Sequence, residues 1–263
     1  MCTLLIGIDI LGPGTLVLGA NRDEHPDRAT DGPGVLRERP RVVGGRDRVA
    51  GGTWLAIREE RVVSALMNRR PEPGDDADPT SLRSRGLLCL EAAAAGPVFG
   101  GAARIDPGTG ESRPERLDFL LRLFSRERYA RCTLVVVSLG EGAWAIHGGG
   151  REAPPSVVPI GPGWHVITHR DLDDPDEPRT RFVRESLRDT RPRTAEESME
   201  ALAGILRRHG EDGTPPVCIH RDRFPTVSSS LIVLGTPEGP RYRHAAGPPC
   251  VTPYEDFSPL LTR

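Results

Sequence analysis

The residue best suited to act as a nucleophile is Cys2, which directly follows Met1. Cysteine is small enough for Met1 to be removed, and removal would leave one residue carrying both a thiol and a free α-amine. The thiolate is the attacking form of cysteine, and an α-amine with a pKa of about 7.7–8.0 is partly unprotonated near neutral pH. Nucleophile and general base would then belong to one residue, as they do for an N-terminal threonine. The alternative is that position 2 is merely tolerant and Cys2 is idle.

Further polar residues lie at the ends of two predicted strands. Asn21, Arg22, Asp23 and Glu24 close one strand, and Asn68 closes a later one. Asp23 can accept a hydrogen bond from the α-amine and fix its direction, while the charge of Arg22 would favour the thiolate. An amide donor at Asn68 aimed at a developing oxyanion would contribute about 3 kcal/mol of transition-state stabilisation. The alternatives are a surface ion pair for Arg22 and Asp23, and a turn residue for Asn68.

Apolar hairpins must position these groups. A first hairpin is predicted from residues 3–10 and 15–20, which flank a Leu-Gly-Pro-Gly turn. A second hairpin is predicted from residues 53–57 and 61–67. Residues 27–50 lack periodicity, so a long loop is predicted there. Hairpin connections build antiparallel sheets, so the order of elements favours an α+β fold with antiparallel sheets between helix layers, in a single domain spanning 1–263. The other predicted elements are helices at 81–95, 114–129, 178–188 and 195–209 and strands at 133–139, 143–147, 164–168, 227–234 and 241–245.

Composition excludes several classes of function. The net charge of −2 argues against a general nucleic-acid binder. All 35 basic residues are arginines, which excludes a Schiff-base lysine, a Ser-Lys dyad and a P-loop lysine. Five scattered cysteines without a CxxC pair fit a reducing compartment, so a cytoplasmic protein is expected. No apolar run approaches the roughly 18 residues of a membrane span.

The combination of motifs resembles the NRDE family, also called the transport and Golgi organisation 2 family. The resemblance rests on the Met-Cys start, the Asn-Arg-Asp-Glu string after a hairpin, Gly-Gly-Thr-Trp-Leu at 51–55, and Asn68; the strand at 228–234 is also similar. That family in turn resembles the N-terminal-nucleophile hydrolases of the choloylglycine hydrolase and penicillin V acylase type. The resemblance implies a four-layer αββα sandwich of two antiparallel sheets between helix layers, and cleavage of linear amides by an N-terminal cysteine.

Carried over residue by residue, the resemblance implies that Cys2 is the nucleophile and that Asp23 holds the α-amine. Asn68 matches an oxyanion donor, and Arg22 stands one position from the arginine that those enzymes place near the thiol. His169 stands where the acylases carry a second asparagine. The candidates are therefore, for catalysis, Cys2, Arg22, Asp23, Asn68 and His169, and, for substrate binding, Asn21, Glu24, Trp54 and Ser228.

The resulting hypothesis is a hydrolase that cleaves a non-peptide C–N amide bond through an acyl-cysteine intermediate, without metal or organic cofactor. Its partner would be a small molecule such as an acyl amide, with no nucleic acid and no membrane span. Two departures from the acylase pattern, His169 and Val227 in place of an asparagine and an arginine, favour an alternative. In that alternative the protein is a non-catalytic carrier of haem, lipid or an acyl group, because members of the resembling family have been linked to haem and lipid handling.

Two possible metal sites are not supported by the sequence. Cys218 and His220 alternate along a predicted strand, but no second pair completes a zinc site, so core packing is the preferred interpretation. The acidic stretch 169–176 lacks the glycine and bidentate glutamate of an EF-hand. Asp176 and Glu177 are instead predicted to cap the helix that begins at Pro178.

Overall fold

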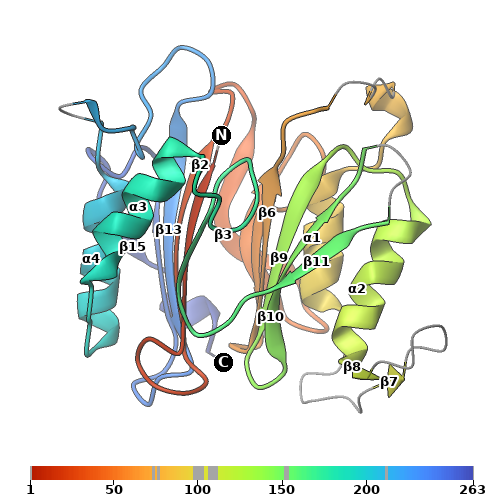
Figure 1. Ribbon diagram of the computed structural model, residues 1–263, viewed down its shortest axis with the longest axis horizontal. Coiled ribbons are helices and arrows are strands. Elements are labelled where there is room, and N and C mark those ends of the chain that lie inside the picture. The colour runs from red at the N-terminus through yellow and green to blue at the C-terminus, as the bar shows by residue number, and fades with distance from the viewer. Residues whose placement is uncertain are drawn as a thin grey trace. The chain divides into compact units, whose positions relative to one another are not determined.

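The computed structural model describes residues 2–72, 75, 78–96, 104–105, 112–150, 154–210 and 213–262. The chain forms two compact units, one made of Met1–Pro33 with Ile160–Arg263 and the other of Gly34–Pro159. In each unit helices cover one face of an antiparallel sheet (Figure 1). This arrangement confirms the predicted α+β class with two antiparallel sheets and two helix layers. The single domain over 1–263 stays a prediction.

The first unit contains the sheet that bears Cys2. Its strand order is β12-β1-β2-β13-β14-β15, and every pairing is antiparallel. The predicted first hairpin is confirmed as β1 (Thr3–Ile8) and β2 (Leu16–Asp23). β2 runs three residues further than expected, so Asn21, Arg22 and Asp23 lie within the strand. The remaining elements are β12 (Gly163–Ile167), β13 (Thr226–Leu234), β14 (Arg241–Ala245), β15 (Glu255–Asp256) and the short helix η3 (Ser258–Leu260).

Helices α3 (Pro178–Arg188) and α4 (Ala195–Leu206) pack on one face of this sheet. Each begins at a side-chain cap that satisfies a backbone N–H of the first turn. Glu177 caps α3, as predicted, and Thr194 caps α4. Alternate strand residues then meet the apolar faces of the helices. This core includes Leu5, Val17, Val166, Leu231 and Val233 from the strands and Val183, Leu187, Met199 and Leu202 from the helices.

The second unit has its own sheet and helix layer. The strand order is β11-β10-β9-β6-β5-β4-β3. Helices α1 (Arg85–Ala94) and α2 (Glu115–Arg126) pack with the central strands through a core that includes Leu88, Leu120 and Leu134. The other elements are β3 (Thr30–Arg37), β4 (Val42–Asp47), β5 (Leu55–Arg58), β6 (Val62–Asn68), η1 (Pro79–Ser81), β7 (Arg104–Ile105), β8 (Ser112–Arg113), β9 (Cys132–Ser138), β10 (Gly142–Gly148) and β11 (Ser156–Pro159).

The predicted long loop over 27–50 is wrong, because β3 and β4 occupy most of it. β3 is an edge strand with mostly half-buried residues, so it needs no apolar alternation. In β4 a Cβ at Gly44 would come within 2.3 Å of the Leu55 carbonyl oxygen of the next strand. Gly44 therefore marks a close approach of two backbones and not a loop.

The structure also tests one predicted strand and the lengths of the helices. Cys218 and His220, which were expected to lie on one strand, are outside the strands of the structure. Across the part of the chain that the structure describes, the helices are too short or too polar to serve as a membrane span.

Candidate functional site

Antiparallel pairing brings four chain segments to one end of the β12-β1-β2-β13 part of the sheet. β1 and β13 begin at this end, whereas β2 and β12 finish there. The register pairs Thr3 with Asn21 and Thr226 with Asp23. The topology therefore places Cys2, which precedes β1, beside the last residues of β2.

The thiol of Cys2 contacts the backbone of Asp23. The Asp23 N–H donates to Cys2 Sγ across 3.4 Å, and Sγ lies 3.8 Å from the Asp23 carbonyl oxygen. Cys2 is half-buried. Burial raises the pKa of the Cys2 thiol, and the negative charge of Asp23 acts in the same direction. The thiol thus needs a nearby base to take its proton before it can attack at neutral pH.

The carboxylate of Asp23 is held on two sides. The Thr226 hydroxyl donates to Oδ1 at 2.7 Å, and Nη1 of Arg179 lies 3.8 Å from Oδ2. Arg179 also donates to the Thr3 hydroxyl at 3.1 Å. Burial raises the pKa of Asp23, while the hydrogen bond from Thr226 and the charge of Arg179 oppose that rise. The carboxylate is consequently buried, oriented and close to the start of β1.

Arg22 and Glu24 form a charged group next to this pair. Arg22 is 6 % exposed, and its Nη2 lies 4.0 Å from Oε2 of Glu24. Arg28 approaches the same carboxylate oxygen at 3.8 Å. The positive charge of Arg22 acts to lower the pKa of Cys2, against the larger effect of burial. Arg22 is therefore close enough to influence the thiol electrostatically.

Asn21 points toward the helix layer. Its side-chain amide donates to the carbonyl oxygens of Leu206 at 2.9 Å and Val217 at 3.0 Å. These bonds tie the last turn of α4 and the segment at 217 to β2. The side chain is buried. Asn21 therefore anchors the backbone around the site, since both amide hydrogens are used within the fold.

His169 and Ser228 also lie at this end of the sheet. His169 follows β12 by two residues, after Ile167, which pairs with Leu4. Ser228 pairs with Arg22, and the register of β13 shifts just before it. Both side chains are buried. An irregularity of this kind often re-aims side chains next to a functional site.

Asn68 and Trp54 belong to the other unit. Asn68 is the last residue of β6, where it pairs with Cys132, and its side chain is exposed. Trp54 is half-buried just before β5, and its carbonyl oxygen accepts from Leu66 N at 2.9 Å. Their places in the site stay predictions.

The sequence analysis missed Thr226 and Arg179, the two side chains that hold Asp23. The available signal for Thr226 was its position at the head of a strand whose second half is apolar. Arg179 gave no local signal, because it lies 176 residues from Thr3 along the chain and meets it only after α3 packs.

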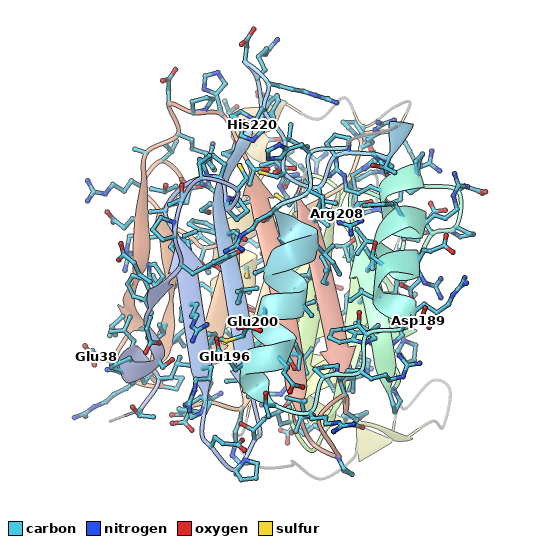
Figure 2. All side chains as sticks on the ribbon, turned by 90° about the vertical axis from the view of Figure 1, so that its left-hand side faces the viewer. Glu38, Asp189, Glu196, Glu200, Arg208 and His220 are labelled. Atoms are coloured by element: carbon cyan, nitrogen blue, oxygen red, sulfur yellow. The ribbon has the colours of Figure 1, made fainter. Side chains whose placement is uncertain are left out.

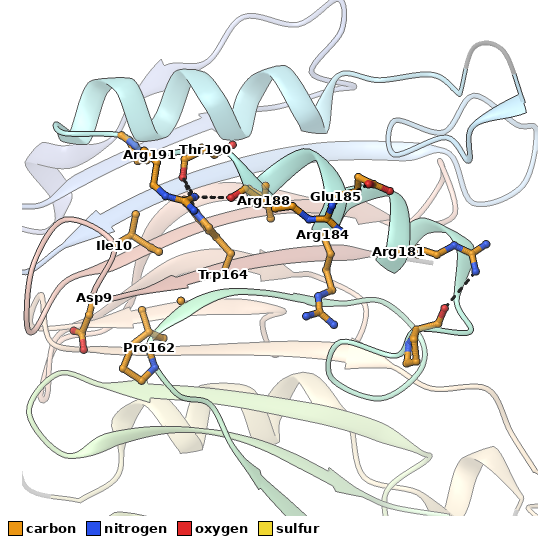
Figure 3. A pocket seen from close by; sticks show the side chains of 15 residues that line it. Asp9, Ile10, Pro162, Trp164, Arg181, Arg184, Glu185, Arg188, Thr190 and Arg191 are labelled. Atoms are coloured by element: carbon orange, nitrogen blue, oxygen red, sulfur yellow. Dashed lines mark hydrogen bonds and ion pairs between the residues drawn. The ribbon is translucent and has the colours of Figure 1, made fainter.

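A cleft of about 810 Å³ lies at the opposite end of the same strands (Figure 3). It is lined by Ile8 and Trp164, and by four arginines of the α3 region. β1 has six residues, so this end is about 20 Å from Cys2 at the usual rise per residue. In this unit the cleft and the cluster of polar side chains around Cys2 therefore lie at opposite ends of the sheet.

The similar solved structures are enzymes with the N-terminal-nucleophile hydrolase fold. An N-acylethanolamine-hydrolyzing acid amidase ortholog from Caenorhabditis elegans matches with a TM-score of 0.58 and 15% identity, covering 90% of this chain and 95% of its own. Penicillin V acylase from Agrobacterium tumefaciens matches with a TM-score of 0.55 and 10% identity, over 97% and 86% of the two chains. The C2A mutant of conjugated bile acid hydrolase from Clostridium perfringens gives 0.51 and 10%, over 98% and 92%.

These structural likenesses confirm the predicted fold. A comparison with curated proteins finds no match. The family model described as Transport and Golgi organisation 2 matches residues 1–210, which is most of the chain and includes the Asn-Arg-Asp-Glu string. The chain belongs to the transport and Golgi organisation 2 family.

Proposed function

We propose that this protein hydrolyses the C–N amide bond of a small acyl amide, with Cys2 as an N-terminal nucleophile. The observation that carries the proposal is the contact of the half-buried Cys2 sulfur with Asp23 at an end of the sheet. The names of the similar structures support the class of substrate, since they describe an amidase, an acylase and a conjugated bile acid hydrolase.

The proposed mechanism needs removal of Met1, a residue that lies outside the described part of the chain. The α-amine of Cys2 then takes the thiol proton, and Sγ attacks the amide carbonyl carbon. The protonated amine gives its proton to the leaving nitrogen as the C–N bond breaks, which leaves an acyl-cysteine. Water then gives a proton to the same amine and attacks the acyl carbon, the C–S bond breaks, and the amine returns the proton to the sulfur as the carboxylic acid leaves. Burial and the charge of Asp23 raise the pKa of the thiol, which supports a role for this internal base.

The neighbouring side chains are assigned to supporting roles. Asp23 accepts a hydrogen bond from the α-amine and directs it toward the sulfur, since its carboxylate is already oriented by Thr226. Arg22 favours the thiolate by charge. Asn68 and His169 are proposed as donors to the oxyanion of the tetrahedral intermediate. Glu24, Trp54 and Ser228 are proposed to contact the substrate.

The test begins with the intact mass of the purified protein, which should correspond to loss of Met1. Mixing with a panel of N-acyl amides that release a chromogenic amine should then give turnover and an acyl adduct on Cys2. A chain that retains Met1, or that releases amine without any acyl-enzyme, contradicts the mechanism. Saturable binding of haem or a fatty acid without amine release would instead support the carrier.

A further inference from the structure

Four side chains with metal-binding atoms converge beyond the C-terminal end of α4. They are His209, Cys218, His220 and Cys250, and one nitrogen or sulfur from each lies within 4.8 Å of the other three. The sequence showed only the Cys218 and His220 pair. The fold supplies the missing pair, because it brings His209 and the distant Cys250 to the same place.

The distances among these atoms match those of a tetrahedral metal site. Cys218 Sγ lies 3.6 Å from Cys250 Sγ and 3.7 Å from His220 Nε2, and His220 Nε2 lies 3.2 Å from Cys250 Sγ. With Zn–S near 2.3 Å and Zn–N near 2.05 Å, tetrahedral angles place two sulfurs about 3.8 Å apart, and a sulfur and a nitrogen about 3.6 Å apart. His209 is exposed, and its ligand atom lies within 4.8 Å of the other three.

Backbone contacts hold the four ligands together. The N–H groups of Val217 and Cys218 both donate to the Arg208 carbonyl oxygen, at 2.9 and 2.8 Å. Arg207 Nε donates to the Pro249 carbonyl oxygen at 3.0 Å, which sets Cys250 beside His209. Figure 2 shows Arg208 and His220 near the same end of α4, away from Glu196 in the first turn of that helix.

We propose that His209, Cys218, His220 and Cys250 bind one Zn²⁺ ion in a structural site. Two thiolates and two imidazoles, without a carboxylate, are a donor set that favours zinc over Mg²⁺ or Ca²⁺. Four protein ligands leave no open position for water or substrate, so the ion stabilises the fold and does not act on a substrate. The site is separate from Cys2 and does not depend on the proposed amide hydrolysis.

The position of this site indicates what the ion stabilises. Val217 O accepts from Asn21, and Ile219 N donates to the Thr226 hydroxyl at 2.9 Å. The Thr226 hydroxyl in turn donates to Asp23. Zinc would therefore fix the segment that supports β2 and the Asp23 carboxylate.

A disulfide between Cys218 and Cys250 is the competing explanation for the two close sulfurs. Their separation of 3.6 Å is far above the roughly 2.05 Å of an S–S bond. Two histidines beside the sulfurs also have no part in a disulfide. Both features favour a shared metal ion.

The experiment uses the full chain, expressed without a histidine tag and purified under reducing conditions. Elemental analysis should find about one zinc per chain, in keeping with a four-ligand structural site. Cobalt exchanged for zinc should give the intense visible bands of a tetrahedral thiolate site. Protein with less than one tenth of an equivalent of zinc, no cobalt spectrum and a Cys218–Cys250 disulfide overturns the proposal.

Variants locate the site and guard against misfolding. Cys218→Ser with Cys250→Ser should abolish zinc binding, whereas Cys89→Ser, at a buried cysteine of the other unit, should retain it. His209→Ala removes an exposed ligand and should weaken affinity by more than the roughly 10–100-fold cost of losing an outer-shell partner. His25→Ala is the matched exposed control. Unchanged zinc affinity in folded His209→Ala contradicts the assigned ligand set, and Cys2→Ala should keep its zinc whether or not turnover is real.

Discussion

The two ends of β1 differ in what they offer a substrate. At the Thr3 end, Cys2 contacts Asp23, whose carboxylate is bound by Thr226 and approached by Arg179. The Ile8 end has a cleft of about 810 Å³, but its arginines serve the local structure (Figure 3). Arg181 and Arg191 donate to backbone carbonyl oxygens, and Arg184 and Arg188 face nearby carboxylates.

Oriented polar groups, and not cleft volume, are the reason why we place the proposed reaction at the Thr3 end. A carboxylate held in one direction costs little reorganisation when charge moves during a reaction. Exposed arginines around a cleft are screened by water, and those at the Ile8 end already bind local groups, so they contribute little to positioning a ligand. Substitutions at the two ends test this difference.

The largest effect is expected from Cys2→Ala. Removing the proposed nucleophile should reduce amide turnover by at least about 10³-fold, because the proposed acyl intermediate forms on the Cys2 sulfur. Cys89→Ala is the control, since burial raises the pKa of that thiol to about 12 and it lies in the core of the other unit. Initial rates with a chromogenic amide measure both variants. Equal rates for Cys2→Ala and wild type would remove the proposed mechanism.

The next effect compares one substitution at the two ends. Asp23→Asn keeps the shape and the contact with Thr226 but loses the charge, and kcat should fall by about 10²-fold. Asp9→Asn is the matched control at the cleft end. Asp9 has a positive φ of 57°, a conformation that asparagine tolerates, so folding should be preserved. Circular dichroism checks that both variants fold. Steady-state kinetics should show a loss of kcat in Asp23→Asn and none in Asp9→Asn. An equal loss of kcat in both variants would contradict the proposed difference between the two ends.

A buried histidine on β14, away from both ends compared above, should control stability and not turnover. His244 pairs with Ser230, is buried, and lies with Nδ1 2.9 Å from the Ser230 hydroxyl. Burial lowers the pKa of His244 to about 4. A depressed folded pKa gives a contribution that is complete above about pH 6.5 and is lost as the pH falls toward 4.

The free energy of unfolding should therefore fall by about 2–3 kcal/mol through His244 between pH 7 and pH 4.5. In His244→Gln the part of the free energy of unfolding that is lost on acidification through His244 should disappear. The variant should also lose some stability at neutral pH. Urea denaturation at the two pH values measures the difference. If wild type and His244→Gln lose equal stability on acidification, the assignment is wrong.

The smallest effect is expected at the cleft. Arg184→Ala and Arg188→Ala should each change kcat/KM by less than about twofold, or about 0.4 kcal/mol. Both side chains are exposed and point from α3 into the cleft lining. The same chromogenic assay applies. A tenfold loss in either variant would show that substrate uses the cleft, and would reverse the comparison.

Local pattern was sufficient for the parts of the fold built from neighbouring residues. The β1–β2 hairpin follows from apolar runs around Gly12 and Gly14, and α3 has the predicted bounds because Pro178 begins it. β4 escaped prediction because Gly44 serves close packing and not a turn, and β3 because a half-buried edge strand needs no apolar alternation. The site was partly predictable for the same reason, since Cys2 and the Asn-Arg-Asp-Glu string bracket one hairpin.

The sequence by itself determined the candidate nucleophile, the hairpin that follows it and the α+β class, because each depends on residue types and spacings within a few tens of residues. Only the tertiary structure decided which distant side chains complete each cluster. Thr226 and Arg179 reach Asp23, and Cys250 reaches Cys218, after strands and helices pack. Such contacts depend on register and helix docking, which hundreds of weak apolar contacts determine together and no local motif encodes.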